Sequence, residues 1–171
     1  PAYDRICIRR AKTINGLTDA EEKVIWRKHE TGVMASHIWA PELHYIDGKW
    51  YIYFAAGEHE NIWEIRPYVL ECADADPIGG TWTEMGMMQA LTPPDENTIN
   101  GYDRYSFTDF SLDMTTFEHR GRRYCIWAEK VGRRFGISNL YIAEMSAPNK
   151  LKTVQERHEP VFMPMGKMPT V

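Results

Sequence analysis

Acidic and aromatic side chains stand just ahead of two apolar, alternating stretches of the sequence. The segment SHIWAPE carries Trp39 and Glu42, and the segment SFTDFSLDMTT carries Asp109 and Asp113. Asp113 lies between a leucine and a methionine, where loss of solvent is costly for a carboxylate unless the group is hydrogen-bonded or used, and tends to raise its pKa. A carboxyl in such a place could transfer or direct a proton, or it could cap a turn, and the residues alone leave both interpretations open.

Alternation of apolar and polar residues dominates the chain, and helical periodicity is scarce. Asp47-Gly48 and Arg120-Gly121 each separate two alternating stretches, as tight hairpin turns do. The pattern therefore predicts an all-β chain. The strands are expected within 6–11, 42–56, 68–75, 115–129 and 140–146.

The sequence also repeats itself. A shift of 73 residues superposes Gly48 on Gly121, Tyr51 on Tyr124 and Phe54 on Trp127, and a shift of 71 residues superposes Pro77 on Pro148. Each unit is interpreted as an inner hairpin followed by an outer hairpin, which together make a four-stranded sheet. Tandem sheets of this kind are the blades of a β-propeller, where each blade buries its faces against its neighbours. A β-sandwich whose hairpins match by chance is the alternative.

The repeat divides the 171 residues into roughly two and a half four-stranded blades. Residues 1–30 are interpreted as the second half of a blade, 31–100 as one blade, 101–158 as the next, and 159–171 as the start of a following blade. Two and a half blades cannot close a ring, so we expect this chain to be part of a larger propeller whose remainder is its partner.

Composition and charge exclude several classes of protein. The formal net charge is −4 without a basic stripe, which argues against a nucleic-acid partner. No apolar run approaches the ~18 residues that a membrane span needs, so no membrane association is expected. The three cysteines lie far apart on alternating stretches and are expected to be buried free thiols, with no metal-ligand spacing. The sequence has no glycine-rich phosphate loop, so we expect no organic cofactor.

Three segments together resemble glycoside hydrolase family 43. They are the Trp-Ala-Pro-Glu stretch with GKWYIYFAA, the stretch SLDMTTFEHRGRRYCIWAEK, and the stretch SNLYIAEMSAPNKL, and they occur in the family's order through nearly the whole chain. The likeness is greatest to the α-L-arabinofuranosidase-like members. It implies a five-bladed β-propeller and an inverting glycosidase with three carboxylates in an axial pocket.

The resemblance assigns roles to particular residues. Asp113, in SLDMTTF, matches the Asp that orients the general acid and adjusts its pKa. Trp39, in the Trp-Ala-Pro turn, is expected to be a stacking surface for the sugar, with His37 at the pocket rim. Glu42 is expected to hold the turn by hydrogen bonds more than to contact substrate, and Phe135 to wall the pocket or to be only a strand-end aromatic.

Two of the family's catalytic groups have no match in this chain. The general base occurs in a segment upstream of a strand like YDRICIRRA, and the general acid occurs in an Asn-Glu-Gly or similar motif after LYIAEM. Glu156 and Glu159 lie in a charged connector and are weak substitutes. Inverting hydrolysis needs both groups, about 6.5–9.5 Å apart, so the chain alone is expected to be inactive.

The expected function is therefore that of a glycoside hydrolase in polysaccharide degradation, acting as an exo-α-L-arabinofuranosidase on arabinan or arabinoxylan. A β-xylosidase or endo-arabinanase of the same family is the alternative, and so is a non-catalytic carbohydrate-binding propeller module. The expected partners are arabinose- or xylose-containing oligo- and polysaccharides. Some members of the family hold an axial cation through a His of a later blade, which this chain does not include, and the sequence leaves open whether the protein is cytoplasmic or secreted.

Overall fold

The computed structural model describes residues 3–89, 98–99, 102–103, 107, 110–130 and 138–152. Within these ranges the chain is all-β, as predicted, apart from one 3-10 turn, η1 (Asn15–Leu17). No helix in this part of the chain has the length and apolar character to cross a bilayer. The strands are β1 (Arg5–Ile8), β2 (Lys23–Arg27), β3 (Ser36–Ile46), β4 (Lys49–Gly57), β5 (Arg66–Cys72), β6 (Trp82–Met87), β7 (Thr98–Ile99), β8 (Tyr102–Asp103), β9 (Ser111–His119), β10 (Arg122–Lys130), β11 (Ser138–Ala147) and β12 (Lys150–Leu151).

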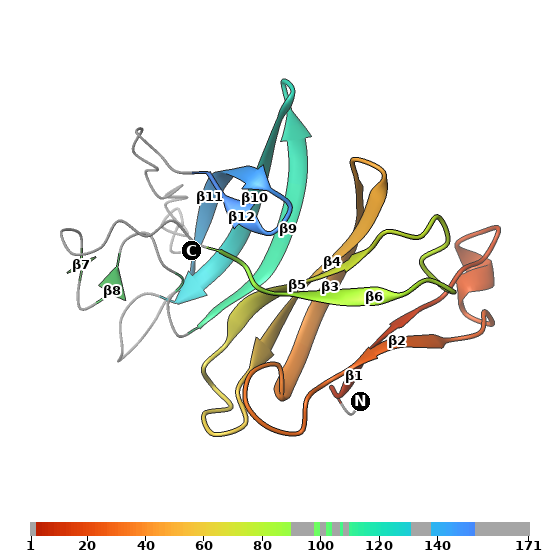
Figure 1. Ribbon diagram of the computed structural model, residues 1–171, viewed down its shortest axis with the longest axis horizontal. Coiled ribbons are helices and arrows are strands. Elements are labelled where there is room, and N and C mark those ends of the chain that lie inside the picture. Colours follow the sequence, from red (N-terminus) through yellow and green to blue (C-terminus); the bar gives the residue numbers. More distant parts are fainter. Residues whose placement is uncertain are drawn as a thin grey trace, which may run out of the picture.

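Two four-stranded antiparallel sheets form the body of the molecule (Figure 1). Their strand orders are β3-β4-β5-β6 and β9-β10-β11-β12, so each sheet is an inner hairpin followed by an outer hairpin, as the repeat predicts. Strands β1 and β2 pair by themselves beside the first sheet, and β7 pairs with β8. The blade boundaries proposed above stay predictions.

Both predicted hairpin turns are confirmed. Asp47 and Gly48 have φ of 48° and 86°, and Arg120 and Gly121 have φ of 50° and 73°. Positive φ at both central residues is the type I′ geometry, whose twist matches that of the flanking strands. The turns fix the cross-strand register, which begins with Ile46 opposite Lys49 in one sheet and His119 opposite Arg122 in the other.

The two central strands of the first sheet, β4 and β5, are buried on both faces. Tyr51 and Tyr53 of β4 join an apolar cluster between the two sheets, while Ile52 and Phe54 join a second cluster against β1 and β2. Successive side chains of a strand point to opposite faces. The stretch KWYIYFAAG is therefore almost continuously buried, because it supplies both cores.

The direction in which repeated residues face decides between propeller and sandwich. Phe54 packs toward β1 and β2, which precede its sheet, and its counterpart Trp127 packs toward β3–β6, which precede its own sheet. Equivalent residues thus face the preceding unit in both cases, as a rotation about an axis requires. In a face-to-face sandwich the repeated faces would instead meet each other.

Hydrogen bonds and backbone bridges join the two sheets. The Tyr53 hydroxyl, on a fully buried side chain, donates to the carbonyl of Pro148 at 2.6 Å. Close to the start of β9, the Ser111 amide donates to the Ile65 carbonyl at 3.0 Å. At the outer side, Gln89 lies in a parallel bridge with Lys150. The two sheets are therefore held at both their inner and outer sides.

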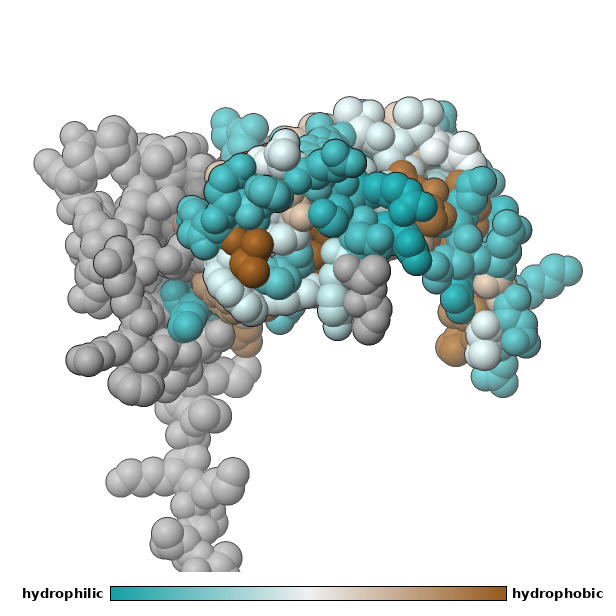
Figure 2. Space-filling view, turned by 90° about the horizontal axis from the view of Figure 1, so that it is seen from below, coloured by the Kyte–Doolittle hydropathy of each residue, from teal (hydrophilic) through white to brown (hydrophobic). Residues whose placement is uncertain are grey.

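Apolar side chains also occupy the faces that the sheets turn away from each other. Leu43 and Tyr45 of β3 are 43% and 59% exposed, and Phe117 and Leu140 of the second sheet are 37% and 46% exposed. On the side of the molecule shown in Figure 2, apolar areas lie separately among hydrophilic ones. Partly covered apolar faces on both outer sides are what neighbouring blades would cover in a propeller.

The three cysteines are free. Cys72 and Cys125 are buried as predicted, but Cys7 is only half-buried, because it lies on the short two-stranded β1–β2 sheet, which has less protein around it.

Candidate active site

The predicted site residues that the structure describes lie on the first strand of each four-stranded sheet. His37, Trp39 and Glu42 are on β3, and Asp113 is on β9. Strand β9 packs beside β3 and β4, and Phe110, just before β9, forms a parallel bridge with Ile65. The fold therefore places the two inner strands, and the residues predicted from them, along one shared edge.

Beta-bulges shape both inner strands. The register of β3 slips between Ser36 and Trp39 and again between Trp39 and Glu42, and the register of β9 slips opposite Trp127. The extra residues include His37, Ala40 and Asp113, with φ of 50°, 45° and 55°. A bulge with a left-handed residue bends its strand and re-aims the local side chains.

The bulge at Asp113 is repeated in the preceding sheet. The shift of 73 residues that superposes Gly48 on Gly121 also superposes Ala40 on Asp113, and both have left-handed backbones. The inner strands thus carry the same distortion at the same place. One of the two positions holds a carboxylate and the other holds a methyl group.

Asp113 has a raised pKa although the residue is exposed. Neighbouring protein desolvates the carboxyl, and the Glu42 carboxylate across the strand edge adds a like charge, so the proton is held more tightly than usual. No donor within the described ranges forms a hydrogen bond with it. The carboxyl therefore releases its proton at a higher pH than an ordinary aspartic acid does.

Glu42 interacts along its own strand. Its Oε2 lies 3.1 Å from Nε2 of His44, and its side chain is 47% exposed. The sequence led us to expect hydrogen bonds within the Trp-Ala-Pro turn, but the carboxylate reaches His44 instead, because residues two apart share one face of a strand. The ring of His44 in turn meets Tyr53 edge-on, with centroids 5.5 Å apart.

Three rings stack beside this edge. The His37 ring lies 4.6 Å from that of Trp39, nearly parallel at 23°, and 4.7 Å from that of Trp63. The two indoles are 6.4 Å apart. Trp63 belongs to the connection between β4 and β5 and was not predicted from the sequence. The available signal was a large aromatic residue in a polar loop, where binding residues are common.

Other predictions lie outside the described residues. Phe135, predicted to wall the pocket, is one of them, and so are Asp109, Glu156 and Glu159. Across the described ranges no three His, Cys, Asp or Glu side chains gather as a metal site would require. An axial cation and its ligands are therefore not placed.

A separate hollow of about 360 Å³ lies away from the inner strands. Four charged residues line it, and Arg10 and Asp76 pair at 3.0 Å across it. It has no aromatic face and lacks the bulged strands, so we assign the chemistry to the inner edge. The lining residues are Arg10, Glu21, Lys23, Asp76, Ile78 and Gly79.

The chain matches a known protein family. The family described as "Glycosyl hydrolases family 43" matches residues 1–166. The chain belongs to this family. The resemblance drawn from the three sequence segments is thereby confirmed.

Curated relatives of this family 43 chain carry arabinofuranosidase names. An "Extracellular exo-alpha-(1->5)-L-arabinofuranosidase" of Streptomyces chartreusis is 47% identical over 157 residues, covering 92% of this chain and 43% of that protein. A protein of the same name from Streptomyces avermitilis is 48% identical, covering 86% of this chain and 28% of that protein. "Alpha-L-arabinofuranosidase 43" of Humicola insolens is 46% identical, with the same two coverages. The chain thus spans less than half the length of these relatives.

A solved structure supports the fold. The crystal structure of an α-L-arabinofuranosidase from Lactobacillus brevis matches with a TM-score of 0.73 and 47% identity, covering 90% of this chain and 45% of that one. With the family match, this identifies the family 43 chain as part of a β-propeller.

Proposed function

We propose that the protein containing this chain is an inverting exo-α-L-arabinofuranosidase that removes terminal arabinofuranosyl units from arabinan or arabinoxylan. One observation carries the proposal: in a family 43 chain, a bulge aims Asp113, with its raised pKa, along the edge that also carries Trp39. The names of the relatives, at 46–48% identity, support the choice of sugar.

The proposed roles follow from position. Inversion needs an acid on the leaving oxygen and a base on the water at the opposite face of the sugar. Asp113, as a positioning residue, would hold the acid in orientation and, as a nearby negative charge, raise the pKa of that acid toward working pH. Trp39 would stack on the terminal sugar. Glu42 would act on Asp113 through its charge, while Phe135 remains a proposed pocket wall.

The test uses the protein encoded by the complete reading frame. It is incubated with α-1,5-linked arabino-oligosaccharides, and the products are followed by chromatography and early-time proton NMR. We expect single arabinose units whose anomeric configuration is first the opposite of the bond cleaved. Internal cuts in linear arabinan would indicate an endo-arabinanase, cleavage of xylobiose alone a β-xylosidase, and binding without cleavage a carbohydrate-binding module, and each would overturn the proposal.

We also propose that the protein acts outside the cell. The two Streptomyces relatives are named extracellular enzymes. Activity found in the culture medium of the source organism would agree with this, and activity confined to washed cells would contradict it.

A further inference from the structure

His37, Trp39 and Trp63 form one stack of rings, which we call the ring wall. His37 is the central member, because its ring is closer to each indole than the indoles are to each other. Two of the rings come from β3, and Trp63 comes from the connection after β4. The wall therefore joins an inner strand to a surface loop.

The Nε2 atom of His37 is buried and has no hydrogen-bond partner among the described residues. Buried polar atoms are normally paired, so an unpaired one calls for an explanation. The indoles of Trp39 and Trp63 lie 4.6 and 4.7 Å from the imidazole, and its Nε2 atom is closed to solvent. The placement of His37 thus agrees with a spacer between the tryptophans rather than with a sugar ligand.

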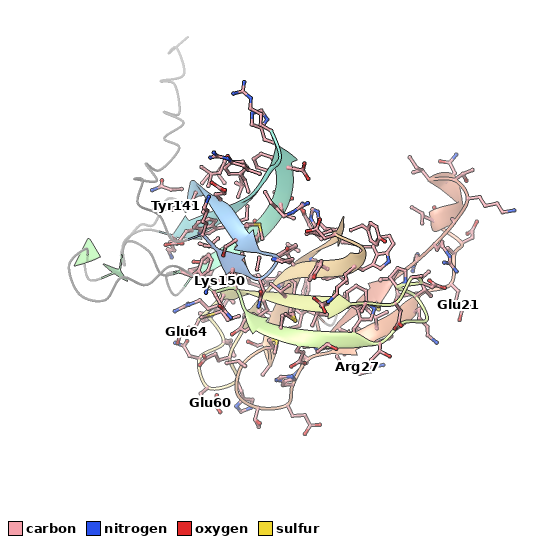
Figure 3. All side chains as sticks on the ribbon, turned by 45° about the horizontal axis from the view of Figure 1, so that its top comes forward. Glu21, Arg27, Glu60, Glu64, Tyr141 and Lys150 are labelled. Atoms are coloured by element: carbon pink, nitrogen blue, oxygen red, sulfur yellow. The ribbon has the colours of Figure 1, made fainter. Side chains whose placement is uncertain are left out.

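Trp63 is exposed but held in place. Its side chain is 58% accessible, and its carbonyl accepts a hydrogen bond from the Ile65 amide at 3.0 Å. Gly57 lets the loop lie against β3, because a Cβ there would collide with the Ile62 carbonyl. Figure 3 labels Glu60 and Glu64, two other residues of the same connection.

The loop of Trp63 is also tied to the strand of Asp113. The Ile65 carbonyl accepts from the Ser111 amide at 3.0 Å, and Asp113 follows two residues later on β9. Trp63 is therefore fixed relative to the proposed catalytic edge. A fixed, exposed aromatic face at the mouth of a site is suited to stacking on an apolar ring face.

We propose that Trp63 determines specificity by binding the sugar unit on the leaving-group side of the cleaved bond. The inference rests on the proposed function. Trp39 is on the innermost strand, whereas Trp63 follows the second strand, one step farther from the inner edge. An exo-acting enzyme encloses the terminal sugar and leaves the rest of the polysaccharide toward solvent. The terminal sugar therefore lies at Trp39 and the next sugar at Trp63.

His37 enters this proposal as a positioning residue. Its ring sets the separation and tilt of the two indoles. Removing the ring should therefore disturb recognition of the second sugar, whereas another flat ring should restore it. A residue that hydrogen-bonded the sugar through Nε2 would not be replaced by a ring without that nitrogen.

The experiment compares two substrates in the protein from the complete reading frame: α-1,5-arabinotriose, which has a leaving-group sugar, and methyl α-L-arabinofuranoside, which has none. We expect Trp63→Ala to reduce kcat/KM for the trisaccharide about five- to tenfold more than for the methyl glycoside, mainly through KM. Trp63→Tyr, which keeps a ring, should retain most of the preference. Tyr45→Ala is the matched control, because Tyr45 is 59% exposed at the other end of β3.

The positioning role has its own pair of variants. His37→Ala should lower the trisaccharide preference, and His37→Phe should restore it. Equal loss in both His37 variants would overturn the spacer role. A Trp63→Ala enzyme that keeps the wild-type preference would overturn the inference while leaving the proposed function intact, whereas a wild-type protein that cleaves neither substrate would overturn the proposed function itself.

Discussion

Both the backbone conformation and the surroundings of Asp113 are unfavourable for an ionised aspartate. The backbone is left-handed, with φ of 55°, and the pKa is raised by desolvation and by Glu42. Non-glycine residues rarely adopt this conformation, although Asp and Asn tolerate it better than most. Such costs commonly persist at sites where function requires them.

The raised pKa of Asp113 predicts that Asp113→Asn stabilises the fold at neutral pH. Because the folded state holds this proton more tightly than the unfolded state, stability contributed by the group is present below its ordinary pKa of 3.8 and is lost as pH rises through the folded value. Asparagine removes the charge and still suits the left-handed backbone. Urea unfolding should show a higher free energy of unfolding for the variant at pH 7 than for wild type, with the gap closing toward pH 3. A less stable variant at pH 7 would contradict the prediction.

Two site residues could be predicted from their neighbours in the sequence. The apolar residues around Asp113 predicted its desolvation, and the Trp-Ala-Pro stretch, which lies in the bulged strand β3, drew attention to Trp39. Trp63 could not be found in this way, because its contact with His37 depends on how the connection after β4 folds back onto β3. The interaction of Glu42 with His44 depends likewise on the strand's local register.

At the scale of single elements, the bulges set the geometry of the site. Strand β3 holds two and β9 holds one, and Ala40 and Asp113 occupy equivalent places. The hairpin turns were predictable because Asp-Gly and Arg-Gly contain the glycine that a type I′ turn favours. The bulges were not, because neither Ala40 nor Asp113 is a glycine and the alternation continues on both sides.

Replacing Ala40 by glycine should stabilise the protein. Ala40 is exposed and has φ of 45°, where a Cβ costs about 1–2 kcal/mol and glycine costs about 0.5–1 kcal/mol in chain entropy. The expected net gain is about 0.5–1 kcal/mol in the free energy of unfolding. Ala73→Gly is the control, because Ala73 is also exposed but has an ordinary negative φ, and it should lose stability. Equal changes in both variants would show that strain at the bulge is absent.

At the scale of the whole molecule, the sheets follow one another around an axis. Phe54 and Trp127 both face the preceding unit, and the cluster between the sheets joins side chains of both. The repeat in the sequence predicted this arrangement, because equivalent residues in successive blades make equivalent contacts. The lengths of the connections between blades carry no such periodic signal, so the blade boundaries could not be fixed from the sequence.

The packing between the blades predicts a contrast between two adjacent methionines. Met88 is 0% exposed in the cluster between the sheets, whereas its neighbour Met87 is 45% exposed. Met88→Ala should lower the free energy of unfolding by about 2–4 kcal/mol through the cavity it leaves. Met87→Ala should change it by less than about 0.5 kcal/mol. Thermal and urea unfolding of both variants measure this, and similar values for the two would contradict the proposed interface.

The turnover of the Asp113→Asn enzyme tests the central claim most directly. In the protein from the complete reading frame, acting on α-1,5-arabinobiose, we predict that kcat falls about 10²–10⁴-fold while KM stays within about threefold. The stability measurement above guards against loss through unfolding. A folded variant that keeps the wild-type kcat would show that this carboxyl takes no part in the reaction, and would contradict the account.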